Sequence, residues 1–167
     1  AVEQVAKNAN EYKTSKGIKG VASQPLYELD TSMSQEIAKQ YEEASVTSNS
    51  QAVKDAYEAL EKETIEQYDF ILSKDLKVEK YEGVGEPYKN SKEMLSDIRD
   101  NNTLKFLPNE GAFGQESGST ENRIGLQPSG RVLDNGYEMT LSEVFRVVHD
   151  YFGHGILGNQ FGAIGEE

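Results

Sequence analysis

Apolar residues recur at three- and four-residue spacing through the first 72 residues, which is the pattern of helices that bury one face. The longest run covers 51–72 and includes Tyr57 and Leu60, which we expect on the buried face. It lies opposite a face rich in Lys and Glu, and it follows Ser50, a residue suited to cap a helix. We therefore expect a helix at 51–72 and shorter helices at 1–15 and 32–44. Because only a short polar run separates the second helix from the longest one, we expect these two to form an antiparallel hairpin.

Apolar and polar residues alternate in the centre of the chain, and a period of two is typical of half-buried strands. The alternation covers 76–81, and a second candidate strand covers 103–107. Asn90 stands before a short apolar-periodic stretch between them, as a helix cap does, so we expect the two strands to pair across a helix. The turn sequence Asp-Asn-Gly at 134–136 predicts a further short hairpin.

These elements predict a mostly helical α+β fold with a small sheet or hairpins and a long Gly-rich loop. A length of 167 residues is enough for one domain with its own core. We divide this domain into a helical part at 1–72, a mixed part of strands and loop at 73–139, and a histidine-containing helix with a Gly-rich tail at 140–167.

The loop at 109–130 shows no periodicity, and so long a stretch is usually a functional lid or a disordered segment. It lacks the Gly-Lys-Ser/Thr sequence of a nucleotide-binding P-loop. We interpret it as a lid over the histidine segment, with Arg123 or Arg131 as contacts for an anion. A surface loop without such a role is the alternative.

The overall composition excludes several classes of function. A net charge of −12 and a pI near 4.7 argue against nucleic acid, whose phosphates need basic patches, and against an anionic membrane surface. Cysteine is absent, so disulfides, thiol catalysis and cysteine-ligated zinc are excluded. We see no apolar run of membrane-spanning length and no signal peptide, so we expect a protein that is not secreted.

A capping box opens the last segment of the chain. Thr140 and Glu143 have the spacing at which the hydroxyl and the carboxylate each accept a backbone N–H of the first turn. A helix is therefore expected from Leu141 onward. Its expected buried face consists of Val144, Phe145, Val147, Val148, Tyr151 and Phe152. Gly153 follows this stripe, and we expect the helix to end there.

Both histidines of the chain, His149 and His154, lie around that expected end. On an α-helix, residues five apart point about 140° away from each other, so the two rings converge only if the helix stops between them. Two imidazoles and a carboxylate suit zinc or Fe(II), and Glu166 and Glu167 are the candidates for the third ligand. Asp150 is the candidate for a group that orients an imidazole or acts as catalytic base. Two structural histidines, one in the core and one in a loop, are the alternative.

The sequence HDYFGH resembles the iron-binding segment of the aromatic amino acid hydroxylases, in which two histidines and a later glutamate hold a catalytic iron. That resemblance implies that His149 and His154 are iron ligands, although the family's glutamate would lie beyond the end of this chain. The HExxH pattern of zinc proteases is absent, because the present spacing is one residue longer.

The second half of the chain, with EPYKNSKEMLSDIRDN and FRVVHDYFGHGILGNQFGAIGEE, is similar to segments of tailed-bacteriophage proteins, some of them large virion-associated polypeptides. This similarity implies a bacteriophage protein in the virion or the host cytoplasm, with other virion proteins as partners. It implies no particular reaction.

These sequence patterns are compatible with two functions. The first is a metal-binding domain of a phage-type protein, either a metal-dependent hydrolase or a non-haem iron enzyme, whose small-molecule substrate the sequence does not specify. The second is a noncatalytic virion structural or interaction module in which the histidine segment is only packed. Since the chain begins with Ala1 and ends directly after the histidine segment, a piece of a larger enzyme is a third interpretation.

Overall fold

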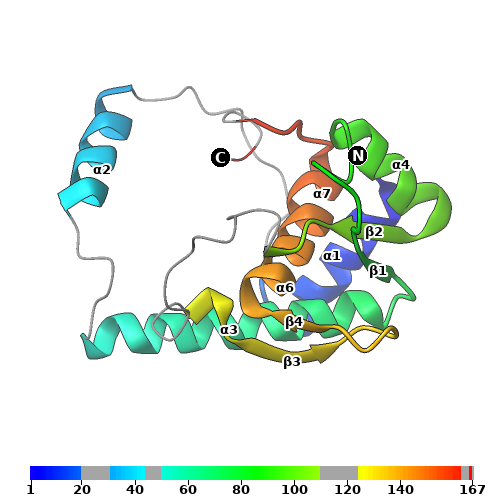
Figure 1. The fold of residues 1–167 in the computed structure, drawn as a ribbon, viewed down its shortest axis with the longest axis horizontal. Helices are drawn as coiled ribbons and strands as arrows, with labels where there is room; N and C mark the ends of the chain where they lie inside the picture. The colour runs from blue at the N-terminus through cyan, green and yellow to red at the C-terminus, as the bar shows by residue number, and fades with distance from the viewer. Residues whose placement is uncertain (20–30, 44–49, 110–123, 163–165, 167) are drawn as a thin grey trace.

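The computed structural model describes residues 1–19, 31–43, 50–109, 124–162 and 166. In this part of the chain the fold is mostly helical α+β, as predicted, with two separate two-stranded sheets. Figure 1 shows the long helix α3 along one side of the molecule and the last helices of the chain stacked above it. None of the described helices combines the length and the apolar character needed to cross a membrane.

The first four helices follow the predicted apolar periodicity. They are α1 (Glu3–Ser15), α2 (Thr31–Glu43), α3 (Gln51–Leu72) and α4 (Ser91–Asn101). At the start of α3 the Ser50 hydroxyl accepts a hydrogen bond from the Val53 backbone N–H, and at the start of α4 the Asn90 side chain accepts one from Glu93. Both predicted caps are therefore confirmed.

Two strands form where they were predicted, and a hairpin forms around the predicted Asp-Asn-Gly turn at 134–136. β1 (Lys77–Lys80) and β2 (Thr103–Phe106) pair in parallel with α4 between them, and β3 (Pro128–Val132) pairs antiparallel with β4 (Glu138–Thr140). The short turn η2 (Ile124–Leu126) precedes β3. The expected loop therefore ends earlier than predicted, and residues 110–123 of it lie outside the described part of the chain.

The last helices of the chain form one continuous element. α6 (Leu141–Val148) leads into a π-helical segment, η3 (His149–His154), and then into α7 (Gly155–Leu157). Gly158, with φ of 74°, is the left-handed residue that ends the element. The predicted end at Gly153 is therefore wrong, because the backbone accommodates that residue in a wider helical turn instead of breaking.

The core lies between this last helical element, α1, α3 and β2. Its fully buried side chains include Ile71, Phe106 and Tyr151. Helix α1 packs against α7 at Val5 and Gly155, where an added Cβ on the glycine would lie 2.7 Å from Val5 Cγ1. The amino-terminal helix is thereby seated directly on the end of the histidine-containing helix.

Two predicted packing arrangements are wrong. Every α2 side chain that the structure describes is exposed, and α2 stands apart from α3, so the expected hairpin does not form (Figure 1). Tyr57 and Leu60, in the first half of α3, are also exposed. Phe145 is 48% exposed because the buried arc of α6 centres on Val144 and Val148, and Phe145 lies about 100° around the helix from Val144.

Candidate metal centre

A buried carboxylate fixes the start of α6. Glu143 is fully buried and accepts hydrogen bonds of 2.9 Å from the backbone N–H groups of Asn109 and Thr140 and from the Tyr137 hydroxyl. The Thr140 hydroxyl accepts the Glu143 N–H in return, which completes the predicted capping box. These bonds tie the first turn of the helix to β4 and to the segment after β2.

The π-helical turn changes which residues of HDYFGH share a face. Hydrogen bonds of a π-helix join residues five apart, so His149 and His154 lie one turn above each other. Their ring centroids are 5.2 Å apart and their planes meet at 83°. The two imidazoles therefore converge without the helix break that we expected. Such turns are rare and occur frequently at functional sites.

Glu166 brings a carboxylate to both imidazoles. Its Oε2 lies 2.8 Å from His149 Nε2, and its Oε1 lies 3.2 Å from His154 Nε2. One ligand atom from each of the three side chains lies within 4.8 Å of the others, and no second group of this kind occurs among the described residues. Metal–nitrogen bonds of about 2.0–2.1 Å separate neighbouring ligand atoms by about 3.0–3.4 Å, and the Glu166–histidine distances of 2.8 and 3.2 Å are close to this range.

The His154 imidazole presents a lone pair to this cluster. Its side chain is 1% exposed, and its Nδ1 lies 3.1 Å from the Asn159 backbone oxygen, which can only accept a hydrogen bond. We therefore assign the ring proton to Nδ1, which leaves Nε2 unprotonated. Nε2 is buried and makes no hydrogen bond, and the atom that faces it, Glu166 Oε1 at 3.2 Å, is a carboxylate oxygen, which accepts hydrogen bonds. Two acceptors that face each other require a proton or a metal ion between them.

Asp150 lies beside the cluster rather than in it. Among the described contacts no hydrogen bond joins it to either imidazole, and the Asn159 backbone oxygen orients His154 instead. Burial raises the pKa of the Asp150 carboxyl to about 6, whereas Arg146, and the two imidazoles when they are protonated, act in the opposite direction. Its role as a catalytic base stays a prediction.

Three further residues were predicted for the site. Glu167 and Arg123 lie outside the described part of the chain, so their roles stay predictions. Arg131 forms two hydrogen bonds of 2.7 Å with the Asp69 carboxylate on α3. This pair already engages the guanidinium, and the role of Arg131 as an anion contact stays a prediction.

Two phenylalanine rings that were not predicted as site residues flank the imidazoles. Phe145 stacks on His149, with centroids 6.3 Å apart and planes at 24°, and Phe161 meets His154 edge-on, at 5.0 Å and 87°. The four-residue spacing of Phe145 and His149 was a usable signal, since it places both on one helix face. No local pattern pointed to Phe161, whose position depends on the path of the chain after Gly158.

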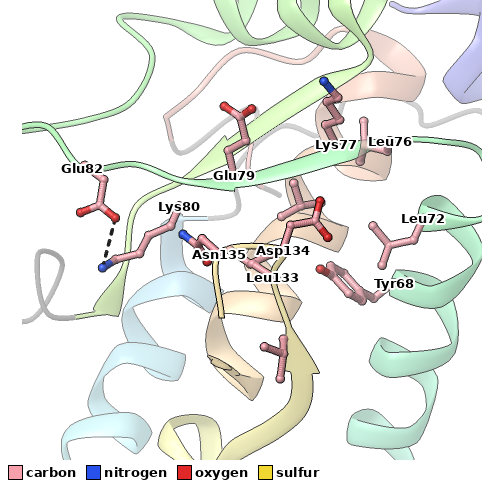
Figure 2. Close-up of a pocket in the computed structure, with 12 residues that line it drawn as sticks. Tyr68, Leu72, Leu76, Lys77, Glu79, Lys80, Glu82, Leu133, Asp134 and Asn135 are labelled. Atoms are coloured by element: carbon pink, nitrogen blue, oxygen red, sulfur yellow. Dashed lines mark ion pairs between the residues drawn. The ribbon is translucent and has the colours of Figure 1, made fainter. Parts of the chain in front are cut away.

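A separate hollow of about 520 Å³ lies between β1, the end of α3 and the turn of the β3–β4 hairpin. Figure 2 shows Tyr68 and Leu72 on one side of it and the Lys80–Glu82 ion pair, 3.4 Å long, on the other. Its lining carries charges of both signs but no histidine and no convergent group of metal ligands. The candidate chemistry of the described residues therefore lies at the histidines.

Fold and cluster together define a mostly helical α+β domain with a candidate site for one metal ion. No family model matches the chain, and no curated protein or solved structure shows significant similarity to it. The function is therefore inferred from the chemistry of the cluster itself.

Proposed function

We propose that the chain is a metal-binding domain in which His149, His154 and Glu166 hold one divalent ion, zinc or Fe(II). The observation that carries this proposal is the buried Nε2 of His154, which makes no hydrogen bond and faces a carboxylate oxygen at 3.2 Å. A buried polar atom without a partner costs roughly 1–3 kcal/mol. A cation between the two acceptors would remove that cost and join all three side chains.

The donor set fits either ion. Two imidazoles and one carboxylate leave coordination positions free, as in catalytic zinc sites and in the facial triads of non-haem iron enzymes. Bound there, such an ion would activate a water molecule or polarise a carbonyl group. The protein holds both imidazoles on a helix that packs into the core, and the Asn159 backbone oxygen fixes the His154 ring. Asp150, next to both rings, is the proposed base.

Access from solvent supports a catalytic role. The His149 and Glu166 side chains are 34% and 42% exposed, so a small molecule can reach the ion from their side. From the resemblance of the second half of the chain to segments of tailed-phage proteins, we infer that this domain belongs to a bacteriophage protein of the virion or host cytoplasm. Other virion proteins are then its proposed partners.

Metal content after gel filtration tests the proposal. The protein is stripped with EDTA, reloaded with zinc or, in the absence of oxygen, with Fe(II), and analysed for metal. We expect about one ion per wild-type chain and far less in His149→Ala and Glu166→Gln, with circular dichroism to verify that both variants fold. Glu138→Gln is the matched control, because it removes the same charge from an exposed position on β4. Wild-type protein that retains neither metal would refute the proposal and leave the histidines as part of a packed module.

A further inference from the structure

A small apolar groove lies one helical turn from the proposed metal ligands. We call it the α3–α6 groove; its volume is about 220 Å³, and Tyr57 and Leu60 of α3 line it opposite Leu141 and Phe145 of α6. Tyr57, Leu60 and Phe145 are 46%, 49% and 48% exposed, respectively. Large apolar side chains that gather in an open groove are typical of binding surfaces.

The α3–α6 groove and His149 lie along one face of the last helical element. Leu141, Phe145 and His149 are spaced four residues apart, so they lie along one helix face at intervals of about 6 Å. Phe145 belongs to both sites, because it lines the groove and also stacks on the His149 ring. One molecule that spans about 6–12 Å could therefore contact the metal ion and fill the groove at the same time.

The volume of the groove limits what it can hold. Sites for whole small molecules measure about 300–1,000 Å³, so 220 Å³ is too small for an entire substrate. A single aromatic ring does fit, since benzene binds in an engineered cavity of about 150 Å³. Glu61 is the charged residue of the lining, and its carboxylate disfavours an acidic group there. The groove is therefore suited to one neutral apolar side group.

We propose that the α3–α6 groove binds the aromatic or branched apolar side group of a carbonyl-containing substrate whose polar reacting group lies on the metal ion. This inference rests on the proposed function, because the metal ion anchors the polar end of the substrate. Leu60 and Phe145 then determine which substrates the site selects.

Two hydroxamates test this inference on zinc-loaded protein by isothermal titration calorimetry. Acetohydroxamate and 3-phenylpropanohydroxamate bind metal through the same two oxygen atoms, but only the second carries a ring. We expect the phenyl compound to bind wild-type protein about tenfold more tightly, and this preference to fall below about threefold in Leu60→Ala. Acetohydroxamate affinity should not change. Leu72→Ala, the same substitution on the same helix outside the groove, should keep the wild-type preference.

The outcomes separate this inference from the metal site. If both compounds bind equally well, or if the preference survives Leu60→Ala, the groove assignment is wrong and the metal site stands. Loss of zinc and of all hydroxamate binding refutes the metal site instead. If the wild-type protein is a dimer and the Leu60→Ala variant is a monomer, a second copy of the chain covers the groove. A preference for the phenyl compound that appears only after Met33→Ser and Ile37→Ser would mean that α2 occupies the groove in the wild-type protein. Either this result or the dimer result overturns the proposal.

Discussion

Replacement of Glu166 by Gln tests the third ligand with little change in shape. The amide has the size of the carboxylate but no negative charge, so it is a much weaker partner for a divalent ion. Zinc at 100 times the wild-type Kd stabilises the folded chain by about 2.7 kcal/mol, if it binds only that state. For a protein of this length, 1 kcal/mol shifts Tm by about 2–4 °C. We therefore expect zinc to raise the wild-type Tm by roughly 5–11 °C.

The variant should lose nearly all of that increase. A loss of affinity of about a hundredfold brings the same zinc concentration to the new Kd, where the stabilisation is only about 0.4 kcal/mol, or less than about 2 °C. Thermal unfolding followed by far-UV circular dichroism, in EDTA and in zinc, measures both shifts, with Glu138→Gln as the charge control. In EDTA, Glu166→Gln should stay within about 1 kcal/mol of wild type, because its contact with His149 is partly exposed. Equal zinc shifts in wild type and Glu166→Gln would refute the assignment of this ligand.

Three further predictions concern the helix that carries the histidines. Deletion of Gly153 shortens the histidine spacing from five to four residues, which on an α-helix still places both rings on one face. This variant should retain zinc in elemental analysis, whereas insertion of an alanine after Gly153 should abolish zinc binding. Zinc that is lost in the deletion and kept in the insertion would contradict the role of the π-turn. Gly155→Ala should lower the free energy of unfolding in urea by about 1–3 kcal/mol, because the new methyl group would lie 2.7 Å from Val5 Cγ1. The cost should be smaller in a Val5→Ala background, and an unchanged cost would mean that another contact is responsible. Glu143→Ala should cost roughly 2–4 kcal/mol in the same assay, since it leaves buried N–H groups without an acceptor, and a cost below about 1 kcal/mol would contradict this reasoning.

Elements that depend on neighbouring residues could be predicted from the sequence. Ser50, Asn90 and Thr140 cap their helices as predicted, because a cap needs only a side-chain oxygen and a backbone N–H three residues later. The pairing of β1 with β2 was also predicted, since two alternating segments flank one short helix. In each case the interaction that forms the element is encoded within a short stretch of chain.

Packing between distant elements could not be predicted in the same way. Periodicity shows that a helix has an apolar face but not what covers it, so Tyr57, Leu60 and Phe145 were placed in the core although they are exposed. The contacts of Asn159 and Phe161 with His154 depend on how the chain turns after the helix. No spacing pattern in the sequence encodes that turn.

Three of the predicted ligand residues, His149, His154 and Glu166, lie together in the structure, but the backbone that brings the two histidines together was not predicted. The argument from angles assumed α-helical geometry on both sides of His149, in which the rings can meet only after a break. The π-turn meets the same requirement by adding one residue to the turn, so the helix continues and His154 stays buried at 1% exposure. A buried ring on a continuous helix is held more firmly than a ring in a loop, which lowers the entropy cost of placing it on a metal ion.

The cluster consequently combines two ligands of fixed position with a third from a later part of the chain. His149 and His154 face each other because both lie on the same helical turn, whereas Glu166 is 42% exposed and reaches both rings from outside that helix. Changes in the helical turn should therefore decide whether a metal ion binds at all, because they move one imidazole relative to the other. A change at Glu166 should instead decide how tightly it binds, since the facing imidazoles persist. The Gly153 deletion and insertion test the first effect, and Glu166→Gln tests the second.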